Sequence, residues 1–153
     1  MRLSSKGRYG VRAMLDVAIY EGMGPVSIKS ISQREGISLN YLEQIFNQLR
    51  KAGLVKSVRG PGGGFLLSLR AREIKIMDIM KALKEVVTPV YCLDDKEKAH
   101  CKYITDCPPR LLWRELGDKI KEVLEETSLE DLLEKSRKTS GLSRPEHKYI
   151  FQI

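Results

Sequence analysis

The chain contains 153 residues, enough for one domain with its own hydrophobic core or for a small domain with an added dimerisation element. Its composition, 42% apolar and 31% charged residues, excludes a disordered protein. No segment has the length and apolarity of a membrane span, and residues 1–20 lack the layout of a signal peptide. We therefore expect a cytoplasmic protein that does not bind a membrane.

The formal net charge of +7 comes from the N-terminal half. Residues 1–72 contain 12 Lys and Arg against 4 Asp and Glu, whereas the remaining residues contain 15 against 16. Binding to the phosphate backbone of a nucleic acid needs such a one-sided excess of cations. A run of charge is more often a solvated surface, and the asymmetry favours nucleic-acid binding without excluding that simpler interpretation.

Two amphipathic helices are predicted first. Residues 6–22 have apolar side chains at helical spacing, and Ser27 caps a shorter helix that ends at Gly36. Arg8 and Arg12 lie one turn apart and would form a basic face near a DNA backbone. The first helix is otherwise expected to contribute to the core.

A third helix runs from its N-cap Ser38 to Gly53. A helix, a short turn with Gly36 and a second helix have the spacing of a helix-turn-helix, in which the first helix braces the second across the DNA. The polar face of the third helix can donate and accept hydrogen bonds to base edges in a major groove. Its side chains are Asn40, Tyr41, Glu43, Gln44, Asn47 and Gln48.

A β-hairpin follows directly. Residues 54–58 and 65–68 have strand character, and the Gly-Pro-Gly-Gly-Gly sequence of residues 60–64 predicts a tight turn. Arg59, at the mouth of this turn, would probe a minor groove, and the glycines allow the backbone to approach a phosphate closely. Either feature alone would be better explained as a plain turn or a solvated helix, but in this order the helix and the hairpin favour DNA.

The C-terminal half contains three cysteines, Cys92, Cys101 and Cys107, between two predicted helices. The first helix, around residues 76–83, ends before Thr88. In a reducing compartment, three thiols in an irregular polar loop are better explained as metal or redox ligands than as structural disulfides. Soft thiolate ligands suit iron-sulfur clusters.

A long helix begins at Pro108 and Pro109, and its apolar positions recur at threes and fours. It is too long for the small head to cover, so a second copy of the chain is expected to bury it. A homodimer would address a palindromic DNA site. Thr127 or Ser128 is expected to cap a last short helix.

Three motifs identify a resemblance to a known family. They are RLSSKGRY at residues 2–9, GISLNYLEQ at 36–44 and LVKSVRGPGGGF at 54–65. The chain resembles the iron-sulfur cluster regulator family, which includes IscR-like and NsrR-like winged helix-turn-helix proteins. The resemblance covers roughly residues 1–135, and the wing motif is very specific.

The resemblance implies a set of DNA-contacting residues. They are Ser38, which also caps the helix, and Asn40, Tyr41, Glu43, Gln44, Arg59 and Gly60. Close relatives carry Ser where this chain has Asn40, a change that could alter a base or phosphate preference. Phosphate repels Glu43 unless its carboxylate accepts a hydrogen bond from a cytosine amino group, so in the family this residue filters base sequence. The alternative is a solvated glutamate.

The resemblance also implies that Cys92, Cys101 and Cys107 hold an iron-sulfur cluster, either [2Fe-2S] or [4Fe-4S]. Eight residues separate Cys92 from Cys101, more than in the family pattern, although extra loop length costs little. The fourth ligand is open, because Arg110 and Arg8 occupy the places of the family's fourth ligands. Candidate replacements are His100, Asp94, Asp95, Asp106, water or a small exogenous ligand; zinc and unligated thiols are weaker alternatives.

The sequence therefore predicts a mainly α protein with a small β-hairpin wing. Residues 1–87 would form the winged helix-turn-helix, 88–110 the cysteine loop, 111–136 the dimerisation helix with a short helix after it, and 137–153 a flexible tail. We predict a cluster-sensing transcription regulator, such as a repressor, and not an enzyme. The alternatives are a cluster-free repressor that senses thiol oxidation, a thiol oxidoreductase, or a protein-binding adaptor.

Overall fold

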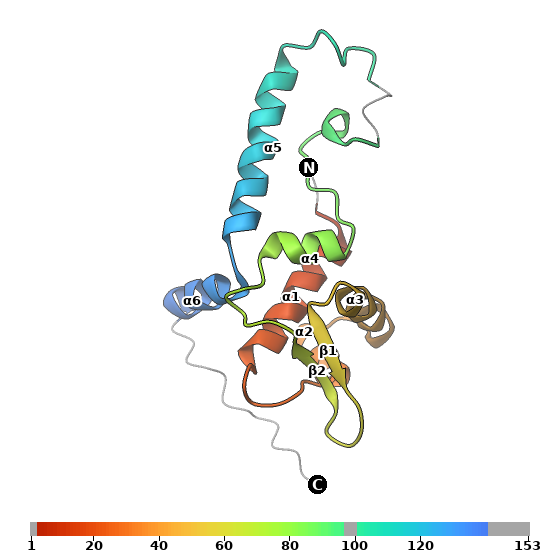
Figure 1. The fold of residues 1–153 in the computed structure, drawn as a ribbon, viewed down its shortest axis with the longest axis vertical. Coiled ribbons are helices and arrows are strands. Elements are labelled where there is room, and N and C mark those ends of the chain that lie inside the picture. Colours follow the sequence, from red (N-terminus) through yellow and green to blue (C-terminus); the bar gives the residue numbers. More distant parts are fainter. Residues whose placement is uncertain (1–2, 97–100, 141–153) are drawn as a thin grey trace.

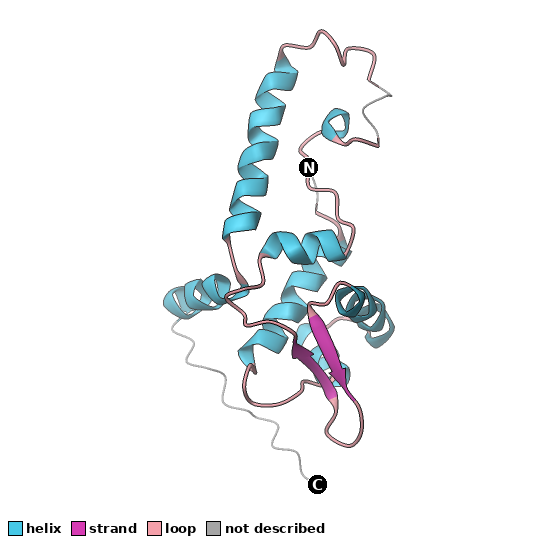
Figure 2. Cartoon of the chain, viewed as in Figure 1, coloured by secondary structure: helices cyan, strands magenta, loops and turns pink. Residues whose placement is uncertain are grey.

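The computed structural model describes residues 3–96 and 101–140 (Figures 1 and 2). A head of helices and one hairpin carries a long helix that stands away from it, with the cysteine segment beside that helix (Figure 1). The elements in chain order are α1 (Ser5–Ile19), α2 (Ile28–Glu35), α3 (Leu39–Lys51), β1 (Val55–Val58), β2 (Gly64–Leu67), α4 (Ile76–Ala82), the 3-10 turn η1 (Tyr91–Leu93), α5 (Pro109–Glu126) and α6 (Leu129–Ser140).

Serine side chains begin the first three helices. Ser4 accepts a hydrogen bond from the Gly7 amide at the start of α1, and Ser27 and Ser38 cap α2 and α3 in the same way. Each cap satisfies an amide that has no partner inside its helix. Gly36 ends α2 with a left-handed φ of 64°, which glycine adopts without steric cost. The predicted helix-turn-helix is therefore confirmed.

The hairpin pairs β1 and β2 antiparallel, with Val55 opposite Leu67 and Val58 opposite Gly64. The strands differ by one residue from the predicted bounds. The head also holds the hairpin through Val26, because the amide and carbonyl of Val26 each bond with Phe65, at 2.9 and 2.8 Å. A Cβ at Gly64 would lie 2.3 Å from the Val26 carbonyl oxygen, so this contact requires glycine.

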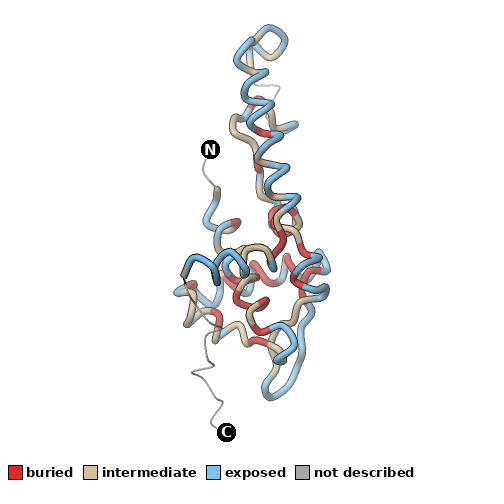
Figure 3. The backbone as a smooth tube through the Cα atoms, turned by 90° about the vertical axis from the view of Figure 1, so that its left-hand side faces the viewer, coloured by how far each residue is buried: buried red, intermediate tan, exposed pale blue. Residues whose placement is uncertain are grey.

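The core joins elements from both ends of the described chain. Fully buried side chains include Met14 of α1, Phe46 of α3 and Leu129 of α6, all in one cluster. The head contains most of the buried residues, whereas α5 is largely exposed (Figure 3). The core of the head therefore includes Leu129, which lies beyond residue 87, the predicted end of the winged helix-turn-helix.

The segment between the head and the cysteines follows α4. This helix ends at Ala82, within one residue of the predicted end at residue 83, and Lys84 then turns the chain with a φ of 56°. Farther on, Pro89 packs against α5 at Gly117, where an added Cβ would lie 3.2 Å from the proline ring. This close approach of the Pro89 ring explains why α5 has a glycine at position 117.

The C-terminal helix α6 is longer than expected. Residues 137–140, predicted to begin a flexible tail, are helical, and that part of the prediction is wrong. The Ser128 hydroxyl accepts from the Asp131 amide and the Asp131 carboxylate accepts from the Ser128 amide, a reciprocal cap at the start of α6. The rest of the predicted tail lies outside the described residues. No helix in the described ranges is long and apolar enough to cross a membrane.

Candidate functional site

The polar face of α3 is open to solvent. Asn40, Glu43 and Gln44 are exposed, while the apolar face of the helix, from Leu42 to Leu49, packs into the core. This division follows the helical period, so three predicted DNA contacts share one accessible surface. The helix therefore presents groups suited to base edges.

The start of α3 is held against α1. Tyr41 is half-buried, and its ring packs edge-on against Tyr9 with the ring centres 6.0 Å apart. Ser38 uses its hydroxyl to accept from the Tyr41 amide at 3.4 Å. Gln48, predicted on the open face, is half-buried, and its Oε1 atom has no hydrogen-bond partner within the described ranges.

Arg59 and Gly60 are exposed and lie in the turn of the hairpin, directly after strand β1, which packs against α3. Figure 1 shows this turn extending from the head. Gly60 has a φ of 102°, a conformation that side chains rarely adopt. A Cβ at Gly63 would lie 2.3 Å from the Val58 carbonyl oxygen. The backbone geometry of this turn thus requires glycine at these positions. Arg59 forms no ion pair with any described residue.

Two ion pairs fix α2 against α1. The Arg34 guanidinium donates to both carboxylate oxygens of the buried Asp16, at 2.9 and 2.6 Å, which raises the pKa of Arg34. Arg12, expected to face a DNA backbone with Arg8, instead donates to the Glu35 carboxylate at 2.8 Å. That expectation missed the cross-helix partner, which is 23 residues away in sequence.

The three cysteines are free thiols: Cys92 is buried in η1, and Cys101 and Cys107 are half-buried. The pKa of Tyr91 is raised, first by the negative charge that Cys101 has when ionised and to a smaller extent by that of Cys92. The side chain of Tyr91 therefore lies close to two of the three thiols. The described residues do not, however, form a group of three His, Cys, Asp or Glu arranged to hold a metal ion.

The donor chemistry of this segment fits an iron-sulfur cluster, since three free thiols supply the soft ligands that iron-sulfur centres take. Binding would require the three thiols to come closer together than they are here. Arg110 lies one helical turn after Cys107, with its amide bonded to the Cys107 carbonyl at 3.0 Å. Its buried Nε atom has no hydrogen-bond partner in the described part of the chain, and a guanidinium cannot replace a ligand histidine. His100, the alternative ligand, lies outside the described residues.

The helix α5 exposes an apolar face. Leu111, Leu112 and Val123 are 68%, 57% and 60% exposed, and Leu116 and Trp113 are also exposed. Large apolar side chains clustered on one helix mark a surface that another protein covers. Trp113 is not among the side chains that pack against the core of the described head.

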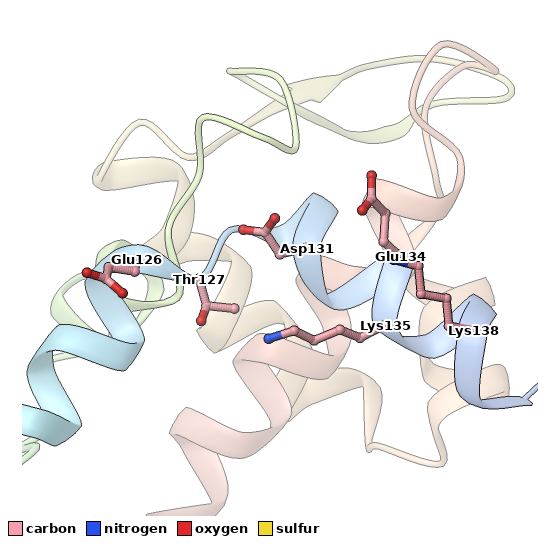
Figure 4. A pocket seen from close by; sticks show the side chains of 6 residues that line it. All are labelled: Glu126, Thr127, Asp131, Glu134, Lys135 and Lys138. Carbon is pink, nitrogen blue, oxygen red and sulfur yellow. The ribbon is translucent and has the colours of Figure 1, made fainter.

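A hollow of about 320 Å³ between α5 and α6 has polar walls (Figure 4). Asp131 lines it, and its pKa is lowered because the Ser128 amide and hydroxyl donate to its carboxylate. Lys135 and Glu134 complete a lining of mixed charge. Within this hollow, Asp131 is engaged by Ser128 in the cap of α6.

Comparison with known proteins identifies the relatives of this fold. The profile of Rrf2, described as an iron-dependent transcriptional regulator, matches residues 3–135. The HTH-type transcriptional regulator IscR of Photorhabdus laumondii is 50% identical over 133 residues, which are 87% of this chain and 79% of that protein. The corresponding regulator of Pectobacterium atrosepticum is 48% identical over the same shares.

Solved structures agree with this relationship. The T. potens IscR structure has a TM-score of 0.75 and 38% identity, covering 94% of this chain and 93% of that one. CymR, the global cysteine regulator of B. subtilis, has a TM-score of 0.73 and 42% identity, covering 88% and 98%. The predicted fold class and the resemblance are confirmed, and the relatives are regulators of transcription rather than enzymes. The chain belongs to the Rrf2 family of iron-dependent transcriptional regulators.

Proposed function

We propose that this transcription regulator acts in the cytoplasm as a homodimer that reads a palindromic operator and senses its signal through an iron-sulfur cluster. The DNA part is supported by two features: the open polar face of α3, and an exposed Arg59 in the turn of a hairpin whose strand β1 packs against α3. Their order and spacing match major-groove and minor-groove reading by one subunit.

The contacts divide into two kinds. Asn40, Tyr41 and Gln44 supply donors and acceptors for bases and phosphates at the start of α3, where Ser38 holds the helix terminus. Glu43 accepts from a cytosine amino group and repels sites that lack one. Arg59 enters the minor groove, and the backbone at Gly60 lies close enough to follow it. Sequence is thus read from α3, while the wing adds affinity.

Dimerisation is supported by α5. Its exposed face, which includes Leu111, Leu112 and Val123, is buried when a second copy packs against it. A two-fold pair presents two α3 helices at a fixed spacing, which requires two inverted half-sites in the DNA. The operator palindrome follows from this symmetry.

Cys92, Cys101 and Cys107 are the residues that would hold the cluster, with Tyr91 beside two of them. A bound cluster supplies a centre whose ligation and oxidation state respond to small molecules. Holding a cluster would bring Cys92, Cys101 and Cys107 together, an arrangement that the described residues do not have. Pro89 and Leu93, on either side of Cys92, lie against Gly117 of α5, so a shift of Cys92 would reach the dimerisation helix. By linkage, the form that binds DNA more tightly is itself stabilised by DNA.

Anaerobic purification tests the cluster directly. Wild type and Tyr103→Phe, a control at an exposed position of the same segment, should contain iron and sulfide and give the absorption and Mössbauer spectra of a cluster. Cys92→Ala should lose both elements. Wild-type protein that contains neither element, even from an anaerobic preparation, would contradict the cluster and leave the three cysteines as a thiol-oxidation switch.

DNA reading is tested separately, on a duplex that the wild-type protein selects from a random pool. Arg59→Ala should weaken binding by about 1–3 kcal/mol, since a groove-inserted arginine is lost. Arg137→Ala, in α6, removes the same charge far from the wing and should have little effect (Figure 1). Equal affinities for wild type and Arg59→Ala would contradict the role of the wing.

A further inference from the structure

A surface cavity of about 560 Å³ lies where three elements meet. Its lining includes Ser4 and Lys6 at the start of α1, Tyr41 at the start of α3, and Lys84 and Glu85 just after α4. One wall is therefore formed by a residue of the proposed DNA-reading helix. The cavity continues that surface toward α1 and α4.

The cavity has a net positive charge. Neither Lys6 nor Lys84 forms an ion pair with a described residue. Glu85 supplies the carboxylate in the lining, and its oxygens accept from the Ser4 amide at 2.8 Å and from the Ser4 hydroxyl at 2.5 Å. The Glu85 carboxylate is thus hydrogen-bonded to Ser4 at the start of α1. Neither lysine is paired with it, so both lysines are available to bind an anion.

The backbone at Lys84 supports a role for its side chain. Among the described residues, Lys84 is the one non-glycine residue with a positive φ, at 56°. The turn closes with the Glu85 amide bonded to the Met80 carbonyl at 2.9 Å, a helix ending that usually carries glycine at the left-handed position. A lysine in a left-handed conformation that glycine adopts at lower cost points to a use for its side chain.

The position of Lys84 is fixed through Glu85. Gly7 of α1 allows the carboxylate to approach, because a Cβ there would lie 3.0 Å from the Glu85 Cδ atom. The bonds from Ser4 then tie the chain after α4 to the start of α1. Glu85 is accordingly a positioning residue, and Lys6 and Lys84 are held on the same cavity as Tyr41.

We propose that this cavity is a phosphate site, in which Lys6 and Lys84 bind the DNA backbone next to the bases that α3 reads. The inference rests on the proposed DNA binding and extends it to a part of the chain outside the helix-turn-helix and wing. It also places a DNA contact at the start of the segment that leads to Cys92. The turn at Lys84 therefore belongs both to the proposed phosphate site and to the start of the segment that leads to Cys92.

Salt dependence of DNA binding tests this site. The variants are Lys84→Gly, which suits the left-handed backbone, and Lys6→Ala; the charge control is Lys138→Ala in α6, on the side of the head away from α3 (Figure 1). Affinity for the selected duplex is measured by fluorescence anisotropy between 50 and 200 mM salt. The logarithmic slope should fall by about 0.9 for each lost phosphate contact in each bound subunit. Over this range wild type should therefore lose about 3-fold to 4-fold more affinity per contact than either variant.

A stability measurement separates the contact from the fold. Lys84→Gly should have a melting temperature equal to or above that of wild type, because strain is relieved, and yet bind DNA more weakly. Glu85→Gln, which keeps an acceptor for Ser4, should bind better than Glu85→Ala. Variant slopes equal to those of wild type and Lys138→Ala would overturn the phosphate site. A wild-type protein whose affinity depends on neither sequence nor salt would instead contradict the proposed function itself.

Discussion

In the ion pair between Asp16 and Arg34, removal of the arginine should destabilise the fold more than removal of the aspartate. Both carboxylate oxygens are engaged, and the side chains are 5% and 21% exposed. Arg34→Ala leaves a carboxylate almost without water and should cost about 3–5 kcal/mol. Asp16→Ala leaves a guanidinium that reaches solvent and lies 4.9 Å from the Tyr20 ring centre, so a cost of about 1–3 kcal/mol is expected.

Urea unfolding of both single variants and of the double variant measures these costs at one fixed protein concentration, since any self-association would link stability to concentration. The double variant should lose less than the sum of the single losses, by about 0.5–3 kcal/mol, because its second substitution removes no further pair. Glu35→Ala is the matched control, since it breaks the more exposed pair with Arg12 and should cost at most about 1 kcal/mol. Additive losses, or an Arg34→Ala loss no larger than that of the control, would refute the reasoning.

Three further outcomes are expected. Glu43→Ala should relax base preference in selection from a random pool while affinity for the best site is largely kept; an unchanged preference would contradict the filter. Gly10→Ala should destabilise the fold by about 1–3 kcal/mol in urea despite better helix propensity, because the new Cβ would lie 2.2 Å from the buried Leu83 side chain. The fold lowers the pKa of Asp131, so its ionised carboxylate contributes to the free energy of unfolding above the unfolded pKa, and this contribution is lost as pH falls below about 4. The free energy of unfolding should therefore fall less steeply with acidification for Asp131→Asn than for wild type.

The features that could be predicted from the sequence are those set by nearby residues. The caps at Ser27 and Ser38 and the left-handed Gly36 involve neighbours within four residues. The open face of α3 follows from helical periodicity alone. These local rules placed the helix-turn-helix and the hairpin to within one or two residues.

Contacts between distant residues could not be predicted in this way. The bond between Arg12 and Glu35, and the pairing of Val26 with Phe65, depend on how helices and hairpin pack. The positive φ of Lys84 had no signal in the sequence, because lysine is not a residue expected in that conformation. The cavity after α4 was missed for the same reason.

The cysteine site was predicted only as a set of residues. Cys92, Cys101 and Cys107 lie in a segment without periodicity, so neither spacing nor pattern fixes how close their thiols come. The buried Nε of Arg110 depends on tertiary packing as well. Residue types indicate the chemistry of such a site, while its geometry depends on the loop conformation.

Burial of Leu129 imposes an order on folding during synthesis. The side chain is 0% exposed, in the core that Met14 and Phe46 begin. A ribosome releases the chain from its N-terminus at about 5–20 residues per second, so several seconds pass between completion of β2 and arrival of α6. During that interval the surface of α1 that packs against α6 is bare, and all of α5 emerges before the head is closed. Helix α5 is thus synthesised before the core of the head is complete.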